Sequence, residues 1–88
     1  MHVIVRASSE DDLFLAEQED GFYCVFGLEE PAPIAVGDEL VGNFTNSRGH
    51  HQTVANLTHG GTVRIVAEDW DCPWERARRQ MEALRHAG

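Results

Sequence analysis

Lysine is absent from this sequence of 88 residues, and its seven basic side chains are all arginine. Fifteen acidic residues outweigh them, so the formal net charge at neutral pH is −8. The acidic excess is concentrated in residues 1–42, which hold ten acids and one arginine. A surface with this charge repels phosphate backbones and anionic membranes. The composition therefore argues against general binding to nucleic acid.

Long apolar runs and an export signal are also missing. Residues 1–6 contain no basic region followed by an apolar stretch, which a signal peptide requires. No segment approaches the ~18 apolar residues that a membrane-spanning helix needs. The two cysteines, Cys24 and Cys72, lie far apart in the sequence, and free thiols in a reducing compartment are the default interpretation, with a disulfide as the alternative. We expect a cytoplasmic protein that does not enter a membrane.

Close pairs of metal ligands are missing as well. Structural zinc sites use short spacings such as two residues between cysteines or three between histidines, and this sequence has neither. Adjacent histidines in a strand point to opposite faces, which separates His50 from His51. The sequence leaves open whether the fold brings His50, His51, His59 or Cys72 together around a metal ion.

Catalytic motifs are absent too. Cys72 lies at a predicted helix start, where the pKa of a thiol is lowered, but no base or oxyanion-binding turn accompanies it in the sequence. Acidic pairs such as Glu29-Glu30 and Asp38-Glu39 lie at turns and strand ends, where charge keeps loops solvated and protects sheet edges. We therefore expect no enzymatic activity, no cofactor and no metal.

The first three quarters of the chain carry the pattern of a small β-rich domain. Apolar and polar residues alternate in short runs rich in β-branched side chains, and glycine and asparagine clusters separate the runs. Gly42, inside one of these runs, predicts a bulge or a sharp bend. The predicted strands cover residues 2–7, 13–18, 22–28, 39–45, 52–58 and 62–68.

The strongest hairpin signal is Asp20-Gly21, between two apolar runs. A two-residue turn at this dipeptide pairs Leu13 with Leu28 and leaves both faces of the hairpin partly apolar. A strand pair that faces water on one side does not need a second apolar face, and such a patch often marks a binding surface. The candidate protein-binding residues are Phe14, Tyr23 and Val25.

A second hairpin connects the last two predicted strands. A three-residue loop over residues 59–61 pairs Thr58 with Thr62 and ends in a glycine that accepts a left-handed conformation. In this register Leu57 and Ala55 lie on the apolar face of the sheet. A shift of one residue would move every side chain of the strand to the other face, so the register decides the core.

Residues 69–88 are predicted to form a helix near 73–86, with Pro73 in its first turn. Trp74, Ala77, Met81 and Leu84 recur at helical spacing and predict one narrow apolar stripe that is buried against the sheet. We predict a single domain over residues 1–88, with a mainly β part over 1–68. Its expected form is a small, strongly bent antiparallel sheet or partly open barrel of the SH3 or OB type, with five or six strands and one C-terminal helix packed on it.

Two hypotheses for function follow. The first is a non-enzymatic interaction module that binds an unknown protein partner or a second copy of itself. The alternative is a domain that binds single-stranded nucleic acid through the arginine-rich helix and its tryptophans. The spacing of Glu75 and Arg79 is also that of an ion pair on a solvated helix surface. The candidate nucleic-acid-binding residues are Arg48, Trp70, Trp74, Arg76 and Arg79.

Overall fold

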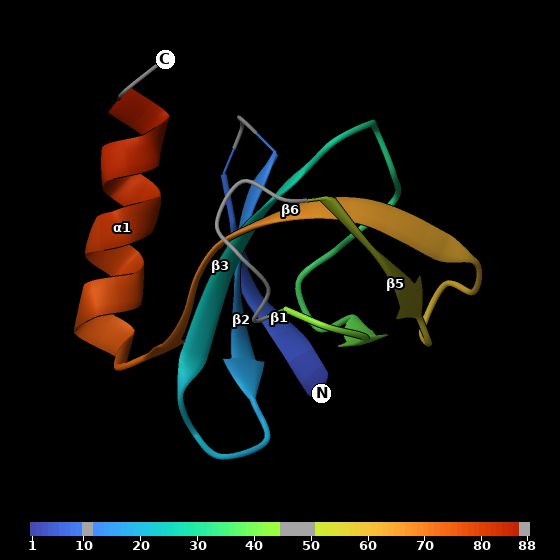
Figure 1. Ribbon diagram of the computed structural model, residues 1–88, viewed down its shortest axis with the longest axis horizontal. Helices are drawn as coiled ribbons and strands as arrows, with labels where there is room; N and C mark the ends of the chain where they lie inside the picture. Colours follow the sequence, from blue (N-terminus) through green and yellow to red (C-terminus); the bar gives the residue numbers. More distant parts are fainter. Residues whose placement is uncertain (10–11, 45–50, 87–88) are drawn as a thin grey trace.

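Six antiparallel strands within the described residues close into a barrel, and one helix lies against its outside in the computed structural model of the chain (Figure 1). The structure describes residues 1–9, 12–44 and 51–86. The predicted mainly β fold with a C-terminal helix is confirmed, and the barrel is closed. The elements are β1 (His2–Ser8), β2 (Leu13–Gln18), β3 (Tyr23–Leu28), β4 (Glu39–Val41), β5 (His51–Asn56), β6 (Thr62–Cys72) and α1 (Trp74–His86).

The barrel consists of two three-stranded meanders. The strand order is β1-β2-β3-β6-β5-β4, so the first meander contains β1 to β3 and the second contains β4 to β6. Antiparallel pairing of β3 with β6 joins the meanders on one side, and pairing of β1 with β4 joins them on the other. This closure gives each described strand a neighbour on both sides, so the sheet has no free edge to protect.

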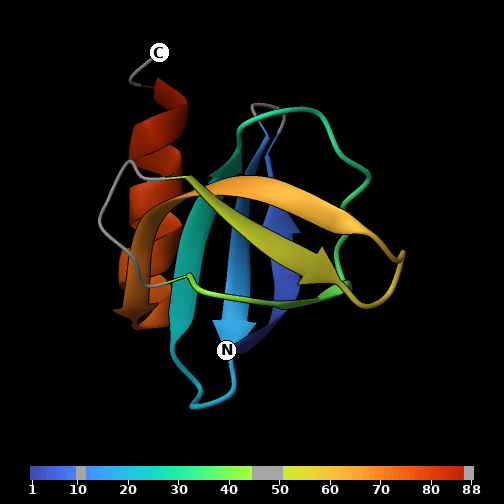
Figure 2. The same cartoon turned by 45° about the vertical axis from the view of Figure 1, so that its right-hand side comes forward.

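The strand β6 is longer than predicted, because it pairs with both meanders in turn. Its first part, from Thr62 to Val66, pairs with β5, and its later part, from Ile65 to Cys72, pairs with β3. The β3–β6 register shifts on both sides of Val25, and such bulges bend a strand and increase its twist. The result is a strand that curves over the barrel (Figure 2, orange).

By contrast, β4 is shorter than the predicted strand over residues 39–45. It ends at Val41, and the chain bends at Gly42, as the glycine predicted. A Cβ atom at Gly42 would lie 2.6 Å from Cγ1 of Val54, on β5. The absence of a side chain therefore allows the end of β4 to approach β5 closely. Phe44, just beyond the bend, is buried in the core, and residue 45 lies outside the described residues.

The β2–β3 hairpin has a different register from the predicted one. Gln18 donates its backbone N–H to the carbonyl of Phe22 at 2.7 Å, which leaves a three-residue loop in place of two residues. Gly21 ends this loop with a φ of 88°, the left-handed conformation that such loops require. The shift pairs Phe14 with Phe26, and their rings stack with centroids 5.5 Å apart.

The β5–β6 hairpin also has a different register from the predicted one. The pairing is shifted by three residues, an odd number, so the side chains of β5 exchange faces. Ala55 pairs with Thr62, and the backbone N–H of Asn56 donates to the carbonyl of Gly61, which leaves a four-residue loop over 57–60. The side-chain oxygen of Asn56 accepts from two backbone N–H groups of this loop, at 3.0 and 2.9 Å. Asn56 thus turns inward to cap the loop. Leu57 is consequently 52% exposed, and Val54 takes the core position.

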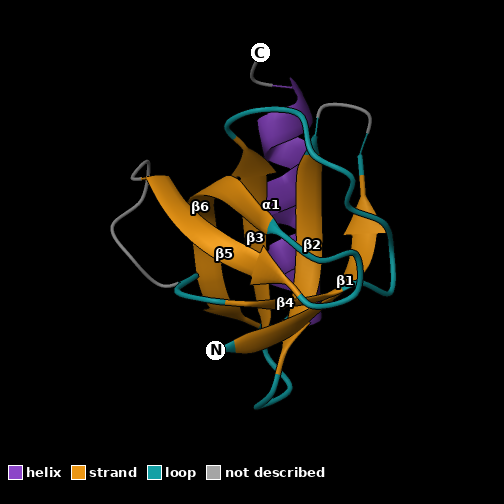
Figure 3. Ribbon diagram, turned by 90° about the vertical axis from the view of Figure 1, so that its right-hand side faces the viewer, coloured by secondary structure: helices purple, strands orange, loops and turns teal. Residues whose placement is uncertain are grey.

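Two apolar clusters lie on opposite sides of the β2–β3 hairpin. The larger cluster fills the barrel, and the smaller one lies between the hairpin and α1, which contacts β2, β3 and β6. Figure 3 shows the barrel in front of this helix. The barrel cluster contains Val3, Val5, Phe14, Ala16, Cys24, Phe26, Leu40, Phe44, Val54, Val63 and Ile65. The buried residues under the helix are Leu15, Val25, Cys72 and Ala77.

Fewer residues of the apolar stripe of α1 are fully buried than predicted. Ala77 is fully buried, and its small side chain lets the helix approach the sheet. Met81 and Leu84 are partly buried beside it. Trp74 is 41% exposed, so the expectation that it is buried against the sheet is wrong. Its position at the first residue of α1 places its ring at the end of the interface.

The close approach at Gly42 yields a prediction for stability. Gly42→Ala should lower the free energy of unfolding by about 1–3 kcal/mol, because the new Cβ would overlap the Val54 side chain. Rotation of the Val54 side chain does not relieve the overlap, since its Cβ and Cα would lie 2.9 and 3.1 Å away. The measurement is urea unfolding followed by circular dichroism.

Gly27→Ala is the matched control for this measurement. A Cβ at Gly27 would meet its nearest neighbour, Cδ2 of Leu13, at 3.5 Å, which is ordinary van der Waals contact. The control should therefore unfold within about 0.5 kcal/mol of the original chain or be slightly more stable. Equal losses at Gly42 and Gly27 would contradict the importance of the close approach.

Candidate functional site

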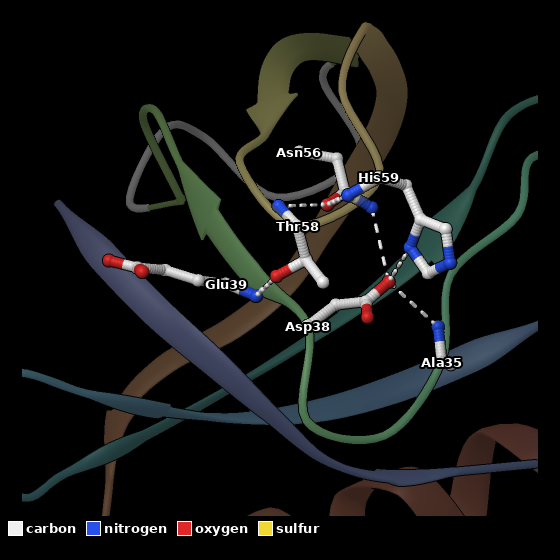
Figure 4. A network of polar contacts seen from close by, with 6 residues as sticks. All are labelled: Ala35, Asp38, Glu39, Asn56, Thr58 and His59. Atoms are coloured by element: carbon white, nitrogen blue, oxygen red, sulfur yellow. Dashed lines mark hydrogen bonds and ion pairs between the residues drawn. The ribbon is translucent and has the colours of Figure 1, made fainter.

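A buried carboxylate, Asp38, is the centre of the polar network that Figure 4 shows. Its Oδ2 atom accepts from the backbone N–H of Ala35 at 3.0 Å and from Nδ2 of Asn56 at 3.2 Å. It also accepts from Nδ1 of His59 at 2.6 Å, because an ionised carboxylate has no proton to donate. The residue is 3% exposed, so these donors replace the water that burial removes.

The hydrogen bonds determine the charge state of Asp38. Burial by itself raises the pKa of this carboxyl group, because it disfavours the charged form. The donors from Ala35, Asn56 and His59, together with the positive charge of His59, lower the pKa by more than burial raises it. The net effect holds the pKa of Asp38 below its ordinary value of 3.8, and the group is ionised at neutral pH.

The network joins two loops of the barrel. Asp38 ends the turn that follows the proline-containing connector, whereas His59 belongs to the β5–β6 loop. The backbone N–H of Glu39 donates to the hydroxyl of Thr58 at 2.9 Å, which adds a second link between the same loops. His59 is 43% exposed, so its ring is held from the inside and faces solvent on the other side. These bonds connect loops, and we assign the network a structural role.

An aromatic pair of one partly buried and one exposed ring lies where β3 begins and α1 begins. The rings of Tyr23 and Trp74 pack edge to face, with centroids 5.2 Å apart and planes inclined by 67°. Tyr23 pairs with Cys72 at the end of β6, and Trp74 follows Cys72 by two residues. The neighbouring Phe22, in the β2–β3 hairpin, is 46% exposed. We call Tyr23 and Trp74 the aromatic surface.

Gln18 fixes the chain that leads into the aromatic surface. Its Nε2 donates to Oδ1 of Asp71 at 2.7 Å, and its Oε1 accepts from the backbone N–H of Asp71 at 2.8 Å. Asp71 has a φ of 52°, a left-handed conformation that aspartate adopts more readily than most residues. These two bonds hold the end of β6, just before α1, against the hairpin.

The structure does not bring the three predicted protein-binding residues to one surface. Phe14 is 5% exposed and lies inside the barrel, and Val25 is buried between the hairpin and α1. The expectation of an exposed apolar face is wrong, because the helix covers that face of the hairpin. Tyr23 is the member that reaches the aromatic surface. Its partner Trp74 was predicted as a buried core residue of the helix and as a candidate nucleic-acid-binding residue, so the pairing with Tyr23 was missed.

The predicted nucleic-acid-binding residues are also dispersed. Arg48 lies outside the described residues, and Trp70 is partly buried against the barrel core. Trp74 and Arg76 are two residues apart on α1, so their side chains point about 200° apart around the helix axis. Only the ring of Trp74, among the described members of this set, belongs to the aromatic surface.

The helix arginines are engaged by groups of the same chain. Arg76 pairs with Asp69 at 3.3 Å, and Arg78 pairs with Glu75 at 3.1 Å. Arg79 donates from Nε to the backbone carbonyl of Glu75 at 3.3 Å. The ion pair between Glu75 and Arg79 that their spacing suggested is thus replaced by pairing of Glu75 with Arg78.

Both cysteines are free and buried. Cys24 faces the barrel interior and Cys72 lies under the helix, so the sheet separates the two thiols. Burial raises the pKa of Cys24 to about 12. Burial, followed by a hydrogen bond with Asp69, raises the pKa of Cys72 to about 11. The lowered pKa expected for Cys72 is therefore wrong, because the thiol is buried beside a carboxylate.

The histidines that the sequence left open as possible metal ligands do not converge among the described residues. His51 pairs with Glu29 at 2.7 Å, whereas His59 pairs with Asp38, and His50 lies outside the described residues. The part of the chain that the structure describes contains no group of three or more side chains suited to a metal ion. It also encloses no pocket.

Comparison of the chain with protein-family models, curated proteins and solved structures found no match. No helix in the described ranges combines the length and the apolar character needed to cross a membrane.

The Asp38 network predicts how stability depends on pH. The folded-state pKa of Asp38 is lowered, so its ionised form stabilises the folded protein. This contribution is complete above the unfolded-state pKa of about 4 and is lost as the pH falls through the folded-state value. Asp38→Asn should lower the free energy of unfolding at neutral pH by about 1–3 kcal/mol, because it misaligns buried donors.

Urea unfolding of the original chain and of Asp38→Asn at several pH values between 7 and 2 tests this. The difference between them should shrink as the pH falls below about 4. His59→Ala, which removes one donor of three, should cost less than Asp38→Asn at neutral pH. A difference that stays constant down to the lowest pH would contradict the role of the charge.

Proposed function

We propose that the chain is a non-enzymatic interaction module that binds a partner protein through the aromatic surface. The observation that carries this proposal is the ring of Trp74, which packs on Tyr23 and is nevertheless 41% exposed. Tyrosine and tryptophan are enriched among the residues that dominate binding energy at protein interfaces.

The surroundings of the aromatic surface support this role, because they hold the rings in place before a partner binds. Tyr23 belongs to a strand paired on both sides, and the chain before Trp74 is fixed by the bonds between Gln18 and Asp71. Side chains that are already ordered lose less conformational entropy on association. The closed barrel therefore serves as the rigid support of a small binding surface.

The alternative function, binding of single-stranded nucleic acid in the manner of an OB-type barrel, uses the same exposed ring. Bases stack on tryptophan, so Trp74 also supports this hypothesis. The ion pairs of Arg76 and Arg78 reduce the positive charge available for phosphates, which favours the protein partner. The two free thiols support a reducing, cytoplasmic setting for either function.

Site-specific photo-crosslinking in the source cell tests the proposal. A benzoylphenylalanine at Phe22 should give a discrete crosslinked protein, because this exposed aromatic position directly precedes Tyr23 in the chain. The same probe at Leu57 should not give that product. Leu57 is similarly exposed but belongs to the β5–β6 loop, which lies across the barrel from α1 (Figure 1).

Adding Trp74→Ser to the Phe22 probe should reduce the crosslink several-fold, since loss of an aromatic anchor typically costs about 2 kcal/mol of binding. Circular dichroism should show that this variant stays folded, because Trp74 lies at the edge of the helix interface. A product of twice the chain mass would identify a second copy as the partner, and a product removed by nuclease would support the nucleic-acid alternative. Equal crosslinking from Phe22 and Leu57 would contradict the proposal.

A further inference from the structure

The helix α1 is held to the barrel by one apolar interface. It contacts β2, β3 and β6, and the fully buried residues of this interface are Leu15, Val25, Cys72 and Ala77. The strand pairs that close the barrel do not involve the helix. Departure of α1 would therefore leave the barrel closed, but it would expose the outer apolar face of the β2–β3 hairpin, which then needs another cover.

The connection between the barrel and the helix is short and bends at one residue. Pro73 is the single residue between the end of β6 at Cys72 and the start of α1 at Trp74. The chain reverses direction at this connection (Figure 1). Asp71 is the residue of β6 that has a positive φ, 52°, and it lies in the bulge where the β3–β6 register shifts. We therefore place the bend that directs α1 onto its own barrel at Asp71.

This bend is strained. A residue with a side chain is less stable in the left-handed conformation than in the extended one, and such strain persists where surrounding contacts impose it. Here the bonds from Gln18 to the side chain and the backbone of Asp71 impose it. An extended Asp71 would release the strain and direct the following residues away from their own barrel. Cys72 precedes a proline, which favours an extended conformation, so the opened connection would continue as an extended chain.

We propose that two copies of the chain exchange α1 through a hinge at Asp71. In this dimer, residues 72–86 of each copy cover the β2–β3 hairpin of the other copy, and the contacts of the helix interface form again between the copies. The structure identifies this occupant, because the hairpin face already fits the same helix. A short and strained hinge favours the exchange, since the strain is released in both copies.

The exchange goes beyond the proposed function and does not depend on it. Tyr23 belongs to the barrel and Trp74 to the exchanged segment, so each aromatic surface of the dimer would combine rings from two copies. A dimer with two such surfaces binds a partner with two matching sites more tightly than a single copy does. A tethered helix has an effective concentration of about 1 mM at its own barrel, so the dimer forms at protein concentrations of that order.

Two substitutions at Asp71 test the hinge. Asp71→Gly and Asp71→Ala both remove the carboxylate that Gln18 holds, and they differ by one methyl group. Glycine adopts the left-handed conformation without steric cost, whereas alanine does not, so alanine should favour the extended hinge. After refolding from urea at concentrations up to about 1 mM, the dissociation constant of the dimer from sedimentation should be at least about ten-fold lower for Asp71→Ala than for Asp71→Gly. Circular dichroism should show the same secondary structure in both variants, because the exchange keeps every element.

A mixed-label sample distinguishes the exchange from other self-association. Isotope-labelled and unlabelled copies of the original chain are unfolded together, refolded as a mixture at about 1 mM and examined by isotope-filtered NMR. The exchange predicts nuclear Overhauser effects between copies, from the methyl group of Ala77 to those of Leu15 or Val25. An original chain that stays monomeric, a dimer without these contacts between copies, or equal dissociation constants for the two variants would overturn the inference. None of these results bears on a crosslink from Phe22 to a different protein, so the proposed function is tested separately.

Discussion

The pairing of β6 with two neighbours is the interaction on which the barrel depends. The first part of this strand completes the second meander, and its later part joins that meander to β3. Without the second set of hydrogen bonds, each three-stranded sheet would have an open edge on this side. The bulges beside Val25 supply the bend that lets one strand serve both sheets.

The position of the aromatic surface follows from this arrangement. The end of β6 delivers the chain to the outer face of the β2–β3 hairpin, where Ala77 and its neighbours cover Leu15 and Val25. The helix thus occupies the face that would otherwise be a large exposed apolar patch. Its first residue, Trp74, lies beyond the covered area and packs on Tyr23. A small aromatic surface is therefore left at the edge of a buried interface.

The sequence predicted the elements of this fold well, because the alternation of apolar residues and the glycine-rich turns are local signals. All six strands and the helix lie near their predicted positions. The hairpin registers were wrong, because they depend on how each loop is closed. The side chain of Asn56 caps its own loop and enters the core, a behaviour that alternation alone does not reveal.

The candidate site was less predictable than the fold. Alternation along residues 13–28 predicts the second apolar face of the β2–β3 hairpin but does not indicate that the helix covers it, so the prediction of an exposed Val25 is wrong. Tyr23 belongs to the same face and is partly buried at the edge of the helix interface, where it contacts Trp74. The Asp38 network joins residues about 20 positions apart, and no local pattern indicates such a contact.

Hydrogen exchange of the β6 amides, followed residue by residue by NMR, tests most directly whether this strand holds the two meanders together. If it does, hydrogen-bonded amides in the part paired with β5 and in the part paired with β3 should exchange only when the whole protein unfolds. Their exchange free energies should then match the free energy of unfolding measured with urea. Fast exchange through a local opening in the part paired with β3, while the part paired with β5 stays protected, would contradict the central role of β6.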